Sequence, residues 1–254
     1  MIYVNGDSHS AGADIIPGIC FAQDDPRYLA YGRRAHPEAV LQTYGYHVAQ
    51  TFNQGFFCEA ESGSSNARIL RTTKEYINKT SNIKNIGCIV IGWTSWDREE
   101  WKHGEDYIQI TASGIDSVPE SMAEEYKKWT IKQTPEELKR KEQLWRDCIW
   151  NFHCELDEKN INHVFFSTNH YIKDSEKWGM WFISTPYCEW LKSKNFEPVE
   201  NSNHYGADGH AAWANVIGKV LGQTYFLSTN SSLTTNTKRS IITHVKNKTI
   251  GFNR

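Results

Sequence analysis

Short apolar runs alternate with longer amphipathic segments through most of the chain. The run from Ile86 to Ile91 is almost continuously apolar, as is typical of a strand buried on both faces of a parallel sheet. Similar runs predict further strands, and helical spacing of apolar residues predicts the helices between them. The strands are expected at 2–5, 56–60, 86–91 and 161–168, and helices at 37–52, at 67–77 and from about 210, with one helix or more over 119–160. This alternation favours right-handed βαβ units and predicts a three-layer α/β/α sandwich with a mainly parallel central sheet.

Several segments do not follow this alternation. Residues 10–36 are irregular, and so long a loop in a compact domain is usually functional. Residues 173–200 are irregular and aromatic, and residues 107–113 predict one arm of a short hairpin. The end of the chain is rich in Ser, Thr and Asn and has a β-like pattern. We therefore expect a main domain of residues 1–225 and a small appendage of residues 226–254.

Charge and hydropathy exclude several classes of protein. The chain has 28 Lys and Arg against 30 Asp and Glu, a net charge of -2, so it lacks the basic field that attracts nucleic acid or anionic lipid. No run approaches the ~20 apolar residues of a membrane span. The first residues lack the basic and apolar regions of a secretory signal. These features predict a soluble protein made in the cytoplasm, without a nucleic-acid partner.

The cysteines give no sign of a disulfide framework or of a metal site. Six of them are scattered without a C-x-x-C pair, and in a chain without a secretory signal they are expected to be reduced and mostly buried. Zinc sites need Cys or His ligands at short spacing, which the sequence lacks. We expect neither a metal nor another cofactor.

Small polar residues follow the predicted strands. Ser8 comes directly after the first strand, in the sequence Gly6-Asp7-Ser8, and Thr94 and Ser95 follow the third. In a parallel sheet these ends lie at one edge, where ligands usually bind. Ser8 is therefore a candidate nucleophile. The alternative is an ordinary turn, with Asp7 accepting backbone N–H groups.

The order and spacing of these blocks resemble the SGNH, or GDSL-type, serine hydrolase family. The resemblance covers most of residues 1–222 and rests on Gly6-Asp7-Ser8, the Gly63 loop, the Gly92 segment and Asp208-Gly209-His210. The run from Ser62 to Ile69 is similar to that of SGNH-like proteins of phages and bacteria. The resemblance implies the flavodoxin-like SGNH fold. It also implies Ser8 as nucleophile, His210 as base, Asp208 as its orienting carboxylate, and the backbone N–H groups of Ser8 and Gly63 in the oxyanion hole.

Two blocks depart from the family pattern. Thr94 stands where the family has an oxyanion-binding asparagine, so Thr94, or the amide of Asn66, would complete the oxyanion hole. Asn66 has the alternative role of capping a helix. The family spacing Asp-x-x-His is Asp-x-His in this chain, and Asp208 has the same capping alternative. His9 and His204 are alternative bases.

Arg98 and the tryptophans suggest what the substrate is. Arg98 could neutralise an acidic group of the substrate, as the alternative to pairing with a nearby carboxylate. The nearby carboxylates are Asp97, Glu99 and Glu100. Tryptophans in the loops at the same sheet edge could stack on sugar rings or pack in the core. They are Trp93, Trp96, Trp101, Trp178, Trp181 and Trp190.

We therefore expect a serine esterase that removes acyl groups, most plausibly acetyl groups, from a carbohydrate or another small ester. One alternative is a weakly catalytic or non-catalytic SGNH scaffold of virion type, which binds a protein partner through residues 226–254 and is virion-associated if phage-encoded. The same residues could also transfer an acyl group to a sugar hydroxyl, since a fold alone does not fix a function.

Overall fold

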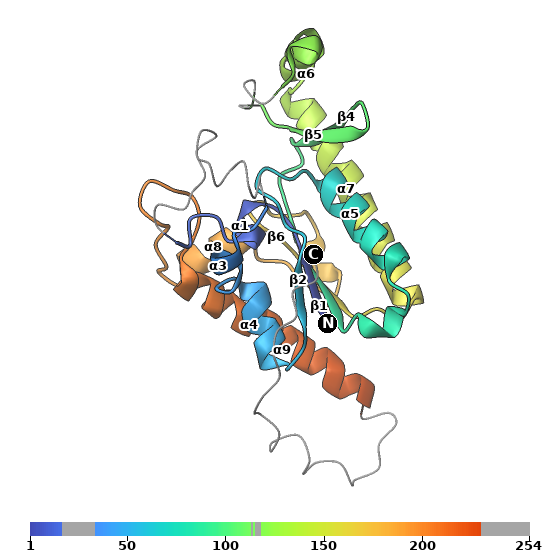
Figure 1. Ribbon diagram of the computed structural model, residues 1–254, viewed down its shortest axis with the longest axis vertical. Helices are drawn as coiled ribbons and strands as arrows, with labels where there is room; N and C mark the ends of the chain where they lie inside the picture. Colours follow the sequence, from blue (N-terminus) through green and yellow to red (C-terminus); the bar gives the residue numbers. More distant parts are fainter. Residues whose placement is uncertain (17–33, 113, 115–117, 230–254) are drawn as a thin grey trace.

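The computed structural model describes residues 1–16, 34–112, 114 and 118–229. A five-stranded sheet lies at its centre, in the order β2-β1-β3-β6-β7, and all neighbouring strands are parallel. Helices cover both faces of this sheet (Figure 1), which confirms the expected three-layer α/β/α architecture. The strands are β1 (Ile2–Asn5), β2 (Phe56–Cys58), β3 (Cys88–Trp93), β6 (His163–Ser167) and β7 (Phe182–Ile183).

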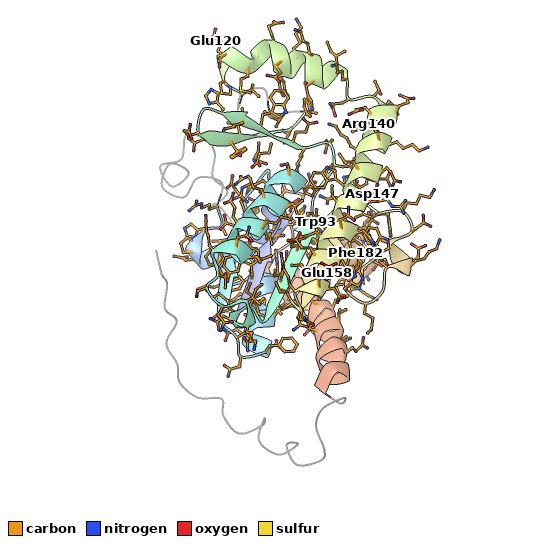
Figure 2. All side chains as sticks on the ribbon, turned by 90° about the vertical axis from the view of Figure 1, so that its right-hand side faces the viewer. Trp93, Glu120, Arg140, Asp147, Glu158 and Phe182 are labelled. Atoms are coloured by element: carbon orange, nitrogen blue, oxygen red, sulfur yellow. The ribbon has the colours of Figure 1, made fainter. Side chains whose placement is uncertain are left out.

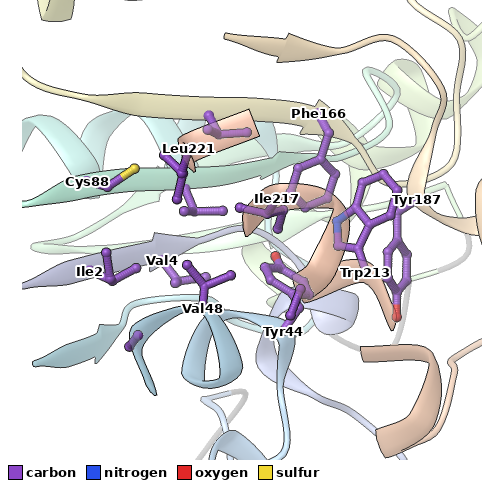
Figure 3. Close-up of a cluster of buried hydrophobic side chains, with 14 of the residues drawn as sticks. Ile2, Val4, Tyr44, Val48, Cys88, Phe166, Tyr187, Trp213, Ile217 and Leu221 are labelled. Carbon is purple, nitrogen blue, oxygen red and sulfur yellow. The ribbon is translucent and has the colours of Figure 1, made fainter. Parts of the chain in front are cut away.

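Side chains alternate between two hydrophobic cores along each central strand, because successive residues of a strand point to opposite faces. In β1, Ile2 and Val4 face one core and Tyr3 faces the other. The first core lies against α4 (Tyr44–Thr51), α8 (Tyr187–Ser193) and α9 (Ala207–Thr229). Figure 3 shows its members Tyr44, Val48, Phe166, Trp213 and Ile217 gathered between these elements.

The second core lies against α5 (Asn66–Lys79) and α7 (Pro135–Glu158). α7 begins with Pro135 in its first turn, and the Thr134 hydroxyl caps it by accepting the N–H of Glu137. Figure 2 shows α7 running past α5 from Arg140 to Glu158. Lys74 and Glu155 join the two helices with an ion pair of 2.6 Å.

One of the expected helices is divided. The helix expected over 37–52 consists of α3 (Pro37–Val40) and α4, because residues 41–43 turn between them. The helical region expected over 119–160 consists of a 3-10 turn, η3 (Glu120–Met122), followed by two helices, α6 (Ala123–Ile131) and α7. Within the described part of the chain, the remaining short helices are α1 (Ser8–Ala11), η1 (Ile83–Asn85) and η4 (Ser175–Lys177).

An antiparallel hairpin, β4 (Glu99–His103) and β5 (Asp106–Ile110), projects from the sheet edge together with α6 (Figure 1). The hairpin arm expected at 107–113 is thus present as β5. Ile110, Tyr126 and Trp129 form a small core of their own here. The hairpin is tied to α5 by the ion pair of Arg71 with Glu100, at 2.7 Å.

The last described element is α9, which continues to Thr229, past the expected domain boundary at residue 225. The appendage beyond residue 229, the Cys20 thiol and most of the expected 10–36 loop lie outside the described residues. Among the helices that are described, none has the length and hydropathy to cross a membrane.

Candidate active site

Gly6 sets the direction in which the chain leaves β1. Its N–H donates to Asn5 Oδ1 at 2.8 Å, and its φ is +156°. A Cβ at this position would lie 2.0 Å from Ser10 Oγ and 2.9 Å from the carbonyl oxygen of Gly92. Only glycine therefore fits this turn, which leads directly into α1 and makes Ser8 its first residue.

Asp7 joins three strand ends beneath Ser8. The side chain is fully buried, and Oδ1 accepts the backbone N–H of His9 at 3.1 Å, as the turn interpretation predicts. Oδ2 accepts the hydroxyls of Thr94, after β3, at 2.7 Å and of Thr168, after β6, at 3.2 Å. Burial alone would raise the pKa of Asp7, but His9, Arg98 and these hydrogen bonds hold the pKa below its ordinary value. Asp7 therefore acts as an anionic anchor of the site.

Ser8 Oγ lies 2.7 Å from Nε2 of His204. The other ring nitrogen, Nδ1, lies 2.7 Å from Oδ2 of Asp14. A carboxylate only accepts hydrogen bonds, so Nδ1 carries the proton and the Nε2 lone pair of a neutral His204 faces Ser8. The side chains of His204 and Asp14 are 20% and 12% exposed. This arrangement suits proton transfer from Ser8 to His204.

Asp14 reaches His204 from the turn that follows α1. Its φ is +62°, a left-handed conformation that aspartate tolerates better than most residues. Oδ2 also accepts the hydroxyl of Ser202, and Ser202 Oγ accepts the backbone N–H of His204 at 3.0 Å. Ser202 thus helps to fix both partners, so the imidazole is oriented from two sides.

His9 packs against the His204 ring. The two ring centroids are 4.8 Å apart at an angle of 63°, and His9 is only 5% exposed. Burial lowers the pKa of His9 to about 4. His9 is therefore uncharged at neutral pH and places no fixed positive charge beside His204.

His210 and Asp208 lie elsewhere. His210 is 1% exposed, and its Nδ1 accepts the backbone N–H of Tyr44 at 3.2 Å. Burial lowers the pKa of His210 to about 3. Asp208 Oδ1 accepts the N–H of Gly209 at 2.8 Å, in the first turn of α9. The structure therefore corrects the expected pairing of Ser8 with His210 and Asp208: His210 ties α9 to α4, and the imidazole beside Ser8 is that of His204.

The two side chains expected to complete the oxyanion hole have structural hydrogen bonds. The single hydroxyl proton of Thr94 goes to Asp7 Oδ2. Asn66 is the first residue of α5, capped by the Ser65 hydroxyl. Its Oδ1 accepts the Thr94 N–H at 2.8 Å, and its Nδ2 donates to the Thr94 carbonyl at 3.0 Å. Asn66 thus holds the backbone of the Thr94 segment and is not the helix cap.

Gly63 and Arg98 belong to neighbouring loops. Gly63 has a φ of +77°, and its loop runs beside the Gly6–Ser8 turn, where the Glu61 N–H donates to the Gly6 carbonyl at 3.2 Å. Arg98 Nη1 lies 3.6 Å from Oδ2 of Asp7. The expectation that Arg98 pairs with Asp97, Glu99 or Glu100 is corrected, because its carboxylate partner is Asp7.

A cavity of about 1470 Å³ opens beside Ser8. Ser95, whose hydroxyl donates to Asp97, lies on one wall with Arg98, and the segment 195–205 forms another. Thr111 and Ala112, directly after β5, also line it. Four asparagines contribute amide groups: Asn169, Asn195, Asn201 and Asn203. No tryptophan is among the described lining residues, and Trp93 is buried in the second core, so the expected sugar-stacking platforms are not found at this cavity.

Sequence reasoning considered His204 only as an alternative and did not consider Asp14. His204 lies in the irregular segment before α9, six residues from His210, and which histidine faces Ser8 is decided by tertiary contacts. The one usable signal for Asp14 is its position in the turn after α1, six residues after Ser8, where Asp tolerates a left-handed backbone.

No protein-family model matches the sequence, and no curated protein is similar to it in sequence. Solved structures resemble its fold. A carbohydrate esterase, whose active site is described as having divergent catalytic and non-catalytic binding functions, is 15% identical, with a TM-score of 0.45 over 87% of this chain and 64% of its own. A protein assigned to the G-D-S-L lipolytic family from Desulfitobacterium hafniense is 10% identical, with a TM-score of 0.39 over 86% of this chain and 98% of its own.

A carbohydrate esterase family 2 enzyme with a carbohydrate-binding domain, from Corynascus thermopiles (Myceliophthora fergusii), is 12% identical. Its TM-score is 0.44, over 89% of this chain and 66% of its own. The chain therefore spans slightly less than two thirds of the length of both carbohydrate esterases.

Proposed function

We propose that the protein is a serine esterase in which Ser8 is the nucleophile, His204 the general base and Asp14 the orienting carboxylate. The observation that carries this proposal is the line of two 2.7 Å contacts from Ser8 Oγ through the His204 ring to Asp14. A nucleophile, a base within hydrogen-bond reach and a third group that fixes the base are the parts that nucleophilic catalysis requires.

Ser8 Oγ attacks the carbonyl carbon of the ester while its proton passes to His204 Nε2. The imidazolium is stabilised by Asp14 and returns that proton to the departing alkoxide, which leaves as an alcohol. A water molecule, deprotonated by His204, then releases the acid from the acyl-Ser8 intermediate. The backbone N–H of Ser8 is available for the oxyanion, because it has no acceptor among the described residues.

The cavity walls favour a polar substrate. The amide and hydroxyl groups that line the cavity suit a molecule rich in hydroxyl groups better than a lipid chain. Within the proposal, the substrate is therefore an acylated polar compound, with an O-acetylated carbohydrate as the leading case. Ser8 is part-exposed to this cavity, so water can reach the acyl-enzyme, which favours hydrolysis over acyl transfer.

The test uses p-nitrophenyl acetate and a serine-directed fluorophosphonate with the full chain and with Ser8→Ala. We expect turnover and labelling at Ser8 in the natural protein, and loss of both in the variant. Absence of turnover and of labelling in the natural protein would favour the alternative of a non-catalytic scaffold. Adding sugar acceptors and measuring acylated products separates transfer from hydrolysis.

A further inference from the structure

In the proposed esterase, neither the Thr94 hydroxyl nor the Asn66 amide is directed toward the oxyanion. The Thr94 hydroxyl has one proton, and that proton is donated to Asp7. The Asn66 amide is turned toward the backbone of Thr94. Neither residue is among those that line the cavity beside Ser8. Any side-chain donor to the oxyanion must therefore come from another residue of the cavity wall.

Arg98 is a donor that lines this cavity and is fixed in position. Its Nη1 donates to Thr94 Oγ1 at 3.0 Å and to the Ser64 carbonyl at 3.4 Å, and lies 3.6 Å from Asp7 Oδ2. Nη2 and Nε have no hydrogen-bond partner among the described residues. The side chain is 24% exposed, so the guanidinium is anchored through one nitrogen at the wall of the cavity, and its remaining N–H groups are free to donate.

The charges around Arg98 suit a transient negative charge better than a permanent one. Asp7, fully buried directly before Ser8, already balances the guanidinium. The lining residues include the carboxylates of Asp14, Asp97 and Glu197, against the cations Arg98 and Lys192. A substrate that carries its own carboxylate would meet this excess of negative charge, whereas a neutral ester develops negative charge only as Ser8 attacks.

We propose that Arg98 is a catalytic residue that donates a hydrogen bond from its free N–H groups to the oxyanion. This inference rests on the proposed esterase function. In the step concerned, Ser8 Oγ bonds to the carbonyl carbon, the π electron pair moves onto the carbonyl oxygen, and the Ser8 proton passes to His204. Arg98 keeps its own proton throughout, and its fixed position costs no reorganisation during the reaction.

The test compares kcat and KM for p-nitrophenyl acetate in Arg98→Gln, Arg98→Ala and Arg98→Lys. Loss of one oxyanion donor is expected to lower kcat by about 10² to 10³-fold while KM changes by less than about threefold. Guanidinium ion added to Arg98→Ala is expected to restore part of kcat. The matched control is Arg71→Gln, which removes a guanidinium bound to Glu100 and Glu75 away from the cavity and should leave kcat unchanged.

Two results would overturn the inference while the natural protein remains active: a kcat of Arg98→Gln within about twofold of the natural value, or a loss confined to esters that carry a carboxylate. The second result would mean that Arg98 binds the substrate anion. If Arg98→Gln does not fold, Asp7→Asn is compared with Asp7→Asn/Arg98→Gln, since the double variant leaves no buried carboxylate unpaired. Inactivity of the natural protein would instead count against the proposed function itself.

Discussion

His204 Nε2 lies 2.7 Å from Ser8 Oγ, although the two residues are 196 positions apart in the chain. The serine is placed by the turn after β1, and the histidine by the segment that precedes α9. The pair therefore forms only when both ends of the α/β unit are in place, which makes it a sensitive reporter of the native fold.

We expect His204 and His210 to give opposite results on substitution. His204→Ala removes the proposed base and should lower kcat for p-nitrophenyl acetate by at least about 10³-fold. His210→Gln should keep kcat within about tenfold, because His210 contacts the Tyr44 backbone and not Ser8. The His210→Gln substitution should instead lower the melting temperature. A larger loss of kcat in His210→Gln than in His204→Ala would refute the assignment of the base.

The same logic separates the two aspartates. Asp14→Asn exchanges a charged acceptor for an amide beside His204 Nδ1 and is expected to lower kcat on the order of 10³-fold. Asp208→Asn changes a carboxylate that accepts the Gly209 N–H, away from Ser8, so kcat should stay within about twofold of the natural value. Steady-state kinetics of the two variants, with circular dichroism to confirm folding, shows which aspartate supports the reaction.

Gly6→Ala is expected to destabilise the protein by about 2–4 kcal/mol, because the new methyl group collides with Ser10 Oγ and approaches the Gly92 carbonyl. The matched control is Gly222→Ala. Gly222 lies in α9 with nothing within 4 Å of a new Cβ, so alanine should stabilise the helix by about 0.5–1 kcal/mol. Urea unfolding of the three proteins measures both effects, and equal stabilities would contradict the steric explanation.

Buried histidines should make stability fall with acid. Burial lowers the folded-state pKa of His210 to about 3, and those of His9 and His163 to about 4, against about 6.5 in the unfolded chain. The unfolded state then binds more protons, so this stability is complete above pH ~6.5 and is lost as the pH falls toward the folded values. Each histidine contributes a slope of about 1.4 kcal/mol per pH unit within its window.

His210→Gln should therefore reduce the slope of unfolding free energy between about pH 4 and 6 by that amount. Urea titrations at several pH values measure the slope. A slope identical to that of the natural protein would show that His210 takes up no proton on unfolding.

The sheet could be predicted from the sequence because its signals are local. Ile89 and Val90 belong to a continuous apolar run, and only a strand covered on both faces buries every position of such a run. Helix boundaries were less accurate where a short turn interrupts an apolar pattern, as between α3 and α4.

The site was only partly predictable. Ser8 could be found because the glycine turn and the end of the strand are adjacent in the sequence. The partners of Ser8 come from segments between the regular elements, Asp14 from the turn after α1 and His204 from the segment before α9. In such segments the sequence does not determine which side chain faces the site. Asp208-x-His210 stands where the resemblance places a catalytic pair, although its spacing is one residue shorter, but His210 is buried and contacts Tyr44.

The cavity is built from separate parts of the chain. Ser8 and Asp14 come from α1 and the turn after it, and His204 comes from the segment before α9. Thr111 and Ala112 of the cavity wall follow the β4–β5 hairpin. That hairpin has a core of its own. The reacting groups and this part of the wall are thus encoded in separate stretches of sequence. Exchange of the contiguous segment 99–112 would therefore alter this part of the cavity wall without replacing Ser8, Asp14 or His204.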